Sequence, residues 1–110
     1  MIDNLFPKHL HFIYEKLLSI YTYARLTGLE YGINLSPHLG YLLIESKDLL
    51  IDINMKQLSN KLNGVYLNAE INEIKVGKFG VNEYTIINKI HFTNNYNQFF
   101  EQLQPYINKL

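Results

Sequence analysis

The chain has 110 residues, of which 47% are hydrophobic and 18% are charged, a composition typical of one globular domain rather than of a disordered segment. Lys plus Arg and Asp plus Glu both number ten, so the net charge of zero provides no long-range field for a polyanion, and we expect no nucleic-acid partner. The absence of cysteine excludes thiolate nucleophiles, disulfides and cysteine-based zinc sites. We therefore expect one domain over residues 1–110, stabilised by packing alone and without a cofactor.

The beginning of the chain gives no indication of a membrane or an export route. The residues MIDNLFPKHLHF contain no basic segment followed by an apolar core, and no apolar run approaches about 18 residues. The triplet Asn34-Leu35-Ser36 matches a glycosylation acceptor, but Pro37 follows it and no secretory signal precedes it, so we interpret the match as chance. These observations favour a soluble, cytoplasmic protein with no membrane partner.

Helical spacing of apolar residues occurs near both ends of the chain. After Pro7 the apolar positions recur every three or four residues, and Gly28 provides a stop, which predicts a long first helix. A last amphipathic helix is expected after Thr93. Pro105 should end or kink that helix near Leu103, because proline lacks the backbone donor and clashes with the preceding turn.

The strongest strand signals lie in the middle of the chain. Residues 41–44 and 49–53 are apolar, β-branched-rich runs separated by the polar residues 45–48, a pattern that predicts a hairpin. The first run is nearly continuous in hydrophobicity, so we expect both of its faces to be covered. The second run alternates apolar and polar residues and is expected to be half buried.

The segments around this hairpin complete the expected fold. Residues 29–35 are interpreted as an irregular or extended link, and residues 55–63 as a short helix ended by Asn63-Gly64. A strand over residues 65–76 is expected to contain a bulge or turn at Asn72-Glu73, where the apolar phase shifts. The following strand, residues 81–92, is expected to point these side chains inward: Tyr84, Ile86, Ile90 and Phe92.

The resulting order of elements is α-β-β-α-β-β-α. Strands concentrated in the middle of a chain, with helices able to cover one face, are typical of an α+β fold. We therefore predict a four-stranded antiparallel sheet in a two-layer sandwich. An open edge strand of that sheet favours pairing with a second copy, so a homodimer is a further expectation.

One cluster of polar residues has the composition of a catalytic or ligand-binding site. Glu45, Asp48 and Asp52 fall within eight residues at the hairpin, and His38 precedes the first run. Paired carboxylates with an imidazole would serve as acid and base, or would hold a cation. The alternative is a solvated loop, because Lys47 lies among the acids and neutralises part of their field.

Two other motifs have simpler structural explanations. His11 and Glu15 lie one helical turn apart, but two ligands are too few for a metal, so no metal site is predicted. Residues 77–80, GKFG, match the loop by which KH domains clamp a nucleic-acid backbone. Strand patterns flank the motif here and the chain has no basic surplus, so a hairpin turn that exposes Phe79 explains the same residues.

Parts of the chain resemble a known family. Residues 29–31 (LEY) followed by residues 37–42 (PHLGYL) resemble the segment that enters the catalytic sheet of the guanidino kinases, the phosphagen kinases and bacterial protein-arginine kinases. Residues 84–89 (YTIINK) and the last helix are similar to that family's late strand and terminal helix, so the resemblance spans about residues 29–110. It places Glu45 where the family has its catalytic cysteine, and the family's phosphate-binding arginines have no counterparts. The resemblance therefore implies a relative without the phosphoryl-transfer chemistry.

Two functions are consistent with these observations. The first is a non-catalytic protein-binding or regulatory protein, such as an inhibitor, an immunity-type protein, a pseudoenzyme or an assembly subunit. Nine Tyr and six Phe support it, because aromatic rings are enriched at protein interfaces. The alternative is a small enzyme or nucleotide-binding protein that uses the acidic and histidine residues near the hairpin. The candidates for exposed interface rings are Tyr14, Tyr23, Phe79 and Tyr106.

Overall fold

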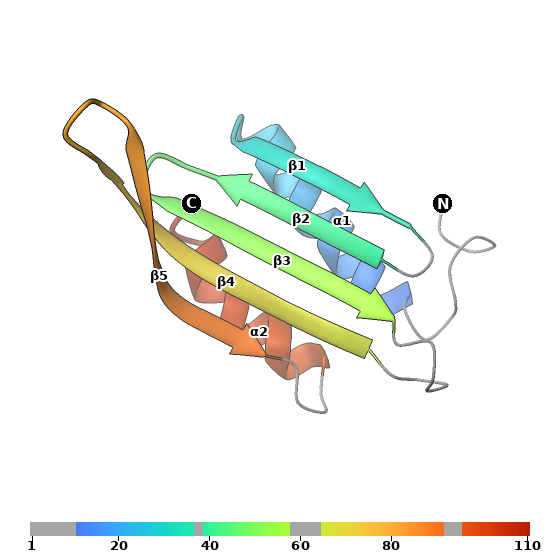
Figure 1. The fold of residues 1–110 in the computed structure, drawn as a ribbon. Helices are drawn as coiled ribbons and strands as arrows, with labels where there is room; N and C mark the ends of the chain where they lie inside the picture. The colour runs from blue at the N-terminus through green and yellow to red at the C-terminus, as the bar shows by residue number, and fades with distance from the viewer. Residues whose placement is uncertain (1–10, 37–38, 58–64, 92–95) are drawn as a thin grey trace.

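The computed structural model describes residues 11–36, 39–57, 65–91 and 96–110, which form two helices and one five-stranded antiparallel sheet (Figure 1). In chain order the elements are α1 (His11–Leu26), β1 (Glu30–Leu35), β2 (Leu39–Glu45), β3 (Leu49–Gln57), β4 (Val65–Val76), β5 (Asn82–His91) and α2 (Tyr96–Ile107). The predicted α+β class and antiparallel sheet are confirmed. The expected four strands and three helices are wrong, because the described residues contain a fifth strand and lack the middle helix.

Every strand pairs with its neighbours in the chain, so the order across the sheet is β1-β2-β3-β4-β5. Ile33 of β1 lies opposite Leu42 of β2, which lies opposite Ile53 of β3 and then Ala69 of β4. Side chains opposite one another in an antiparallel sheet share a face. This register therefore collects apolar residues from four strands on one side of the sheet, and both helices lie on that side (Figure 1).

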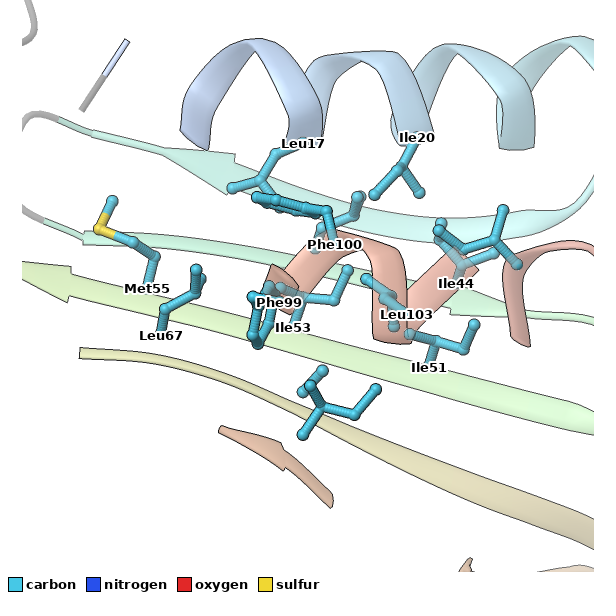
Figure 2. Packing of buried hydrophobic residues seen from close by; sticks show 14 of the residues in the cluster. Leu17, Ile20, Ile44, Ile51, Ile53, Met55, Leu67, Phe99, Phe100 and Leu103 are labelled. Atoms are coloured by element: carbon cyan, nitrogen blue, oxygen red, sulfur yellow. The ribbon is translucent and has the colours of Figure 1, made fainter. Parts of the chain in front are cut away.

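The core fills the space between this face and the two helices. Figure 2 shows Leu17 and Ile20 of α1 and Phe99 and Leu103 of α2 pointing toward the sheet, where Ile53 and its neighbours meet them. The rings of Phe99 and Phe100 meet edge to face, with centroids 5.1 Å apart. One cluster of buried side chains thus joins both helices to the central strands.

The first strand and the end of the third differ from their predictions. Residues expected as an irregular or extended link include β1, because Glu30–Leu35 pairs with β2 along its full length. The helix expected over residues 55–63 is wrong for its first part, since β3 continues to Gln57 and Met55 keeps the inward alternation. Residues 58–64 lie outside the described part of the chain.

Two expectations, one about burial and one about a helix end, are also corrected. In β2 only alternate residues are buried, so Leu42 and Ile44 face the core while Tyr41 is exposed, and the expectation of two covered faces is wrong. The helix α2 passes through Pro105 to Ile107 instead of ending near Leu103. The missing donor of Pro105 affects only the last turn, and the burial of Leu103 and Ile107 holds that turn against the core.

An irregularity between β4 and β5 reverses the predicted facing of part of β5. Ile71 lies opposite Asn88 and Asn72 lies opposite Ile86, so Ile87 is an extra residue in β5. The prediction of a bulge in β4 at Asn72-Glu73 is wrong, because the extra residue lies in β5 and β4 pairs with β3 without interruption through Glu73. Because an extra residue changes the phase of a strand, Ile86 and Tyr84 are exposed rather than inward, whereas Ile90 is buried as expected. Phe92 lies outside the described residues.

Beyond the bulge, β4 and β5 extend past the rest of the sheet. The last pair between β3 and β4 is Leu49 with Glu73, and we call the following residues 74–84 the arm. The arm is visible at the upper left of Figure 1 as a narrow hairpin. At its turn the backbone N–H of Gly80 donates to the carbonyl of Gly77 over 3.2 Å, and Gly80 has a φ of 74°, which favours glycine.

Two leucines on α1 provide a matched test of the core. We expect Leu17→Ala to lower the free energy of unfolding by about 2–5 kcal/mol, because Leu17 is fully buried and its truncation leaves a cavity. Leu26→Ala is the control and should change it by less than about 0.5 kcal/mol, because Leu26 is 80% exposed. Urea unfolding monitored by circular dichroism measures both. Equal losses in the two variants would contradict the packing of α1 on the sheet.

Candidate functional site

The sheet face turned away from the helices carries polar and aromatic side chains, and neither described helix covers it. We call it the open face. One row across all five strands runs through residues that the register places directly opposite one another: Asn34, Tyr41, Asn54, Asn68 and His91. The next row toward the end of β3 contains Leu39, Lys56 and Tyr66. These two rows place amides beside aromatic rings.

A hollow of about 460 Å³ lies over these rows. Its lining residues from the open face include Asn34, Tyr41, Asn54, Lys56, Tyr66 and Asn68. This volume falls within the range of about 300–1,000 Å³ that is usual for small-molecule sites. The hollow is therefore large enough to hold a small molecule.

Asn68 differs from the other amides around the hollow. It is only 7% exposed, and its Oδ1 atom has no hydrogen-bond partner in the described part of the chain. A buried acceptor without a donor costs about 1–3 kcal/mol. Such groups are uncommon in folded proteins and call for a specific explanation.

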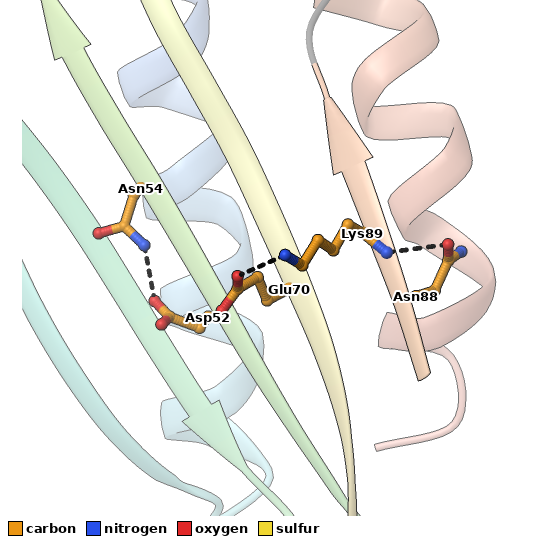
Figure 3. A network of polar contacts seen from close by, with 5 residues as sticks. All are labelled: Asp52, Asn54, Glu70, Asn88 and Lys89. Atoms are coloured by element: carbon orange, nitrogen blue, oxygen red, sulfur yellow. Dashed lines mark hydrogen bonds and ion pairs between the residues drawn. The ribbon is translucent and has the colours of Figure 1, made fainter. Parts of the chain in front are cut away.

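A charged row lies on the same face, next to the row of Asn54 and Asn68, and Figure 3 shows its residues Asp52, Glu70 and Lys89. Asp52 of β3 lies opposite Glu70 of β4, which lies opposite Lys89 of β5. The Nζ of Lys89 is 3.8 Å from a carboxylate oxygen of Glu70, and Asn54 Nδ2 donates to Asp52 Oδ1 over 2.9 Å. Burial raises the pKa of the Asp52 carboxyl above its ordinary value, the hydrogen bond from Asn54 lowers it, and the charge of Glu70 raises it.

The polar site predicted from the sequence is only partly assembled. Glu45 and Asp52 are on the open face, but Glu45 Oε2 accepts a hydrogen bond of 3.2 Å from the hydroxyl of Tyr84. Asp48 is exposed in the turn between β2 and β3, where its carbonyl accepts from the N–H of Ile74 over 2.9 Å. His38 lies outside the described residues. In the described ranges, no three His, Asp or Glu side chains lie close enough to share a metal ion.

The four predicted interface rings have different environments. Tyr14 is fully buried, so the expectation of an exposed ring there is wrong; its hydroxyl donates to the carbonyl of Ser36, and burial raises its pKa to about 12. Tyr106 is half-buried and accepts a hydrogen bond of 2.8 Å from Asn88. Tyr23 is partly exposed, and Phe79 at the tip of the arm is 93% exposed.

The residues around the hollow were not recognised in the sequence as a site. Asn34, Asn54 and Asn68 each belong to a different strand, and asparagine in a strand pattern has no motif of its own. Their only sequence signal is that each alternates with apolar residues of its strand. Their proximity depends on the register of β1, a strand that was not predicted, and on that of β3 with β4.

The raised pKa of Asp52 predicts a pH-dependent effect of Asp52→Asn. The folded state holds this proton more tightly than the unfolded chain, so stability is lost as the pH rises from the ordinary value of 3.8 through the raised pKa. We expect the stability of the variant relative to the wild type to increase between about pH 3 and about pH 7. Urea unfolding at both pH values measures this difference. A difference that shrinks as the pH rises would contradict the burial of this carboxyl.

Comparisons of the chain with protein-family models, with curated proteins and with solved structures found no match. The guanidino-kinase resemblance therefore stays a prediction from short phrases. In the structure residues 39–42 of its first phrase lie in β2, and Glu45 ends that strand. Neither helix in the described ranges has the length and apolar character needed to cross a bilayer.

Proposed function

We propose that this chain is a non-catalytic protein that acts by binding another protein through its arm. The observation that carries this proposal is the exposure of Phe79, 93% at the tip of the arm. Val76 and Val81 flank the tip and are also exposed. Single exposed apolar residues are common on protein surfaces, but a group of them on one projecting element is typical of an interaction site.

The construction of the arm supports a role in contact with a partner. Beyond Glu73 its two strands have no third strand beside them among the described residues, and an isolated two-stranded ribbon is at best marginally stable in water. The root is nevertheless anchored, because Ile74 is buried and Tyr84 is hydrogen-bonded to Glu45. An anchored root with an apolar tip is suited to insertion into a cleft of another molecule.

The chemistry of the tip indicates what kind of surface would receive it. Lys75 and Glu73 lie 3.4 Å apart and balance one another's charge, while Lys78 and Glu83 add one charge of each sign. The tip therefore presents the apolar side chain of Phe79 with no net charge around it. A complementary partner would present an apolar pocket that admits Phe79, as expected for the target of an inhibitor, an immunity-type protein, a pseudoenzyme or an assembly subunit.

Phe79→Ser tests this proposal against Leu26→Ser, a change at another highly exposed apolar residue. The tagged wild type and both variants are used to capture proteins from an extract of the source cells, followed by quantitative mass spectrometry. We expect a partner retained by the wild type and by Leu26→Ser to bind about 30-fold more weakly to Phe79→Ser, the effect of losing one central aromatic contact.

Size-exclusion chromatography with light scattering on the same three proteins examines self-association. A wild-type dimer that Phe79→Ser converts to a monomer would identify the partner as a second copy of this chain. Equal retention of every captured protein by Phe79→Ser and Leu26→Ser, with no change in oligomeric state, would contradict a binding role for the arm.

A further inference from the structure

The hollow on the open face is separate from the arm. Lys56 and Tyr66, which line it, lie near the end of β3 and the start of β4, whereas the arm begins beyond the opposite end of that strand pair. The proposed contact through Phe79 therefore leaves the hollow unexplained. Its volume of about 460 Å³ is suited to a small molecule.

Two tyrosines on alternate strands bound the hollow. Tyr41 of β2 and Tyr66 of β4 are 41% and 49% exposed, and β3 runs between them. A Cβ atom added to Gly32 of β1 would lie 3.7 Å from Cε2 of Tyr41, so this ring leans over Gly32 and away from β3. The space above β3 is left open between the two tyrosines. Aromatic side chains in such positions favour a ligand with a flat ring that stacks on them.

The polar groups around the hollow indicate which hydrogen-bonding groups the flat ring of a ligand must carry on its edge. Asn68 lies directly opposite Asn54, and the Oδ1 of Asn68 is the buried acceptor without a partner in the described residues. This atom is closed to solvent in the structure, so a ligand that satisfies it needs a hydrogen-bond donor and a rotation of the Asn68 side chain toward the hollow. The 6-amino group and N7 of adenine offer an adjacent donor and acceptor that match one asparagine amide, whereas guanine offers two acceptors on the same edge.

The charge around the hollow adds a second requirement. Among the described side chains that line it, Lys56 is the only one with a full charge at neutral pH, and no carboxylate is present. A single lysine binds a phosphate as a point charge. The net charge of zero over the whole chain provides no field for a long polyanion, which favours a free nucleotide over a nucleic acid.

We propose that the hollow binds an adenine mononucleotide. The base lies between Tyr41 and Tyr66, its amino edge pairs with the amide of Asn68, and its phosphate lies at Lys56. This inference is independent of the arm, so Phe79→Ser should bind the nucleotide as the wild type does.

Calorimetric titration with adenosine 5′-monophosphate, guanosine 5′-monophosphate and adenosine tests the site. We expect the adenine nucleotide to bind at least about tenfold more tightly than the guanine nucleotide, because guanine bound in the same orientation presents two acceptors, O6 and N7, to the Asn68 amide. Lys56→Ala should weaken binding of the adenine nucleotide by about tenfold and leave the affinity for adenosine unchanged. Lys78→Ala, on the arm, is the matched lysine control and should alter neither affinity.

Amide and side-chain NMR shifts during the same titration locate the ligand. The proposal requires the Asn68 side-chain amide and the signals of Tyr41, Lys56 and Tyr66 to move with the adenine nucleotide. No binding at about 1 mM ligand, equal affinity for both nucleotides, or shifts confined to other residues would overturn it. Tighter binding of an adenine oligonucleotide than of the mononucleotide, with a strong salt dependence, would also overturn it by assigning the surface to nucleic acid.

Discussion

The packing of two helices against a single face of the sheet determines which side chains of each strand are buried and which are left on the other face. Each helix contributes one apolar stripe. Together the two stripes cover the inward-facing residues of four neighbouring strands, such as Ile33, Leu42, Ile53 and Ala69. Side chains that alternate with these positions cannot reach the helices. The open face is the consequence, and both the amide rows and the hollow belong to it.

The parts of the fold that follow from local patterns were predictable from the sequence. The helical spacing around Leu17 and the hairpin between β2 and β3 each depend on a few neighbouring residues. The parts that depend on pairing were not. In residues 30–35, Gly32 and Asn34 weaken the strand signal of Tyr31 and Ile33, and the strand conformation is completed by hydrogen bonding along β2.

The same distinction separates the predicted site from the observed one. Acidic residues close in sequence, such as Glu45 and Asp48, suggested a shared site, but the Glu45 carboxylate is hydrogen-bonded to Tyr84 while Asp48 is exposed in the turn. Asn54 and Asn68 are far apart in sequence and directly opposite in space. Met55 shows how local spacing misleads. It lies at helical spacing from Leu58 and Leu62, which led to the predicted helix over residues 55–63, yet it also continues the alternation of β3, and the strand is what forms. Which residues lie together in the sheet depends on the register between strands, and the identity of the side chains alone does not give that register.

The order of the strands has a consequence for how the chain reaches this structure. Each strand pairs only with the strands before and after it, so no connection crosses the sheet and short turns such as residues 46–48 and 77–81 join consecutive strands. The entropy lost in closing a loop grows with its length. Pairings between sequence neighbours keep the contact order below that of a sheet with crossover connections, and a lower contact order is associated with faster folding among small domains. The sheet can therefore be assembled one hairpin at a time, with the two terminal helices docking onto a face that is already formed.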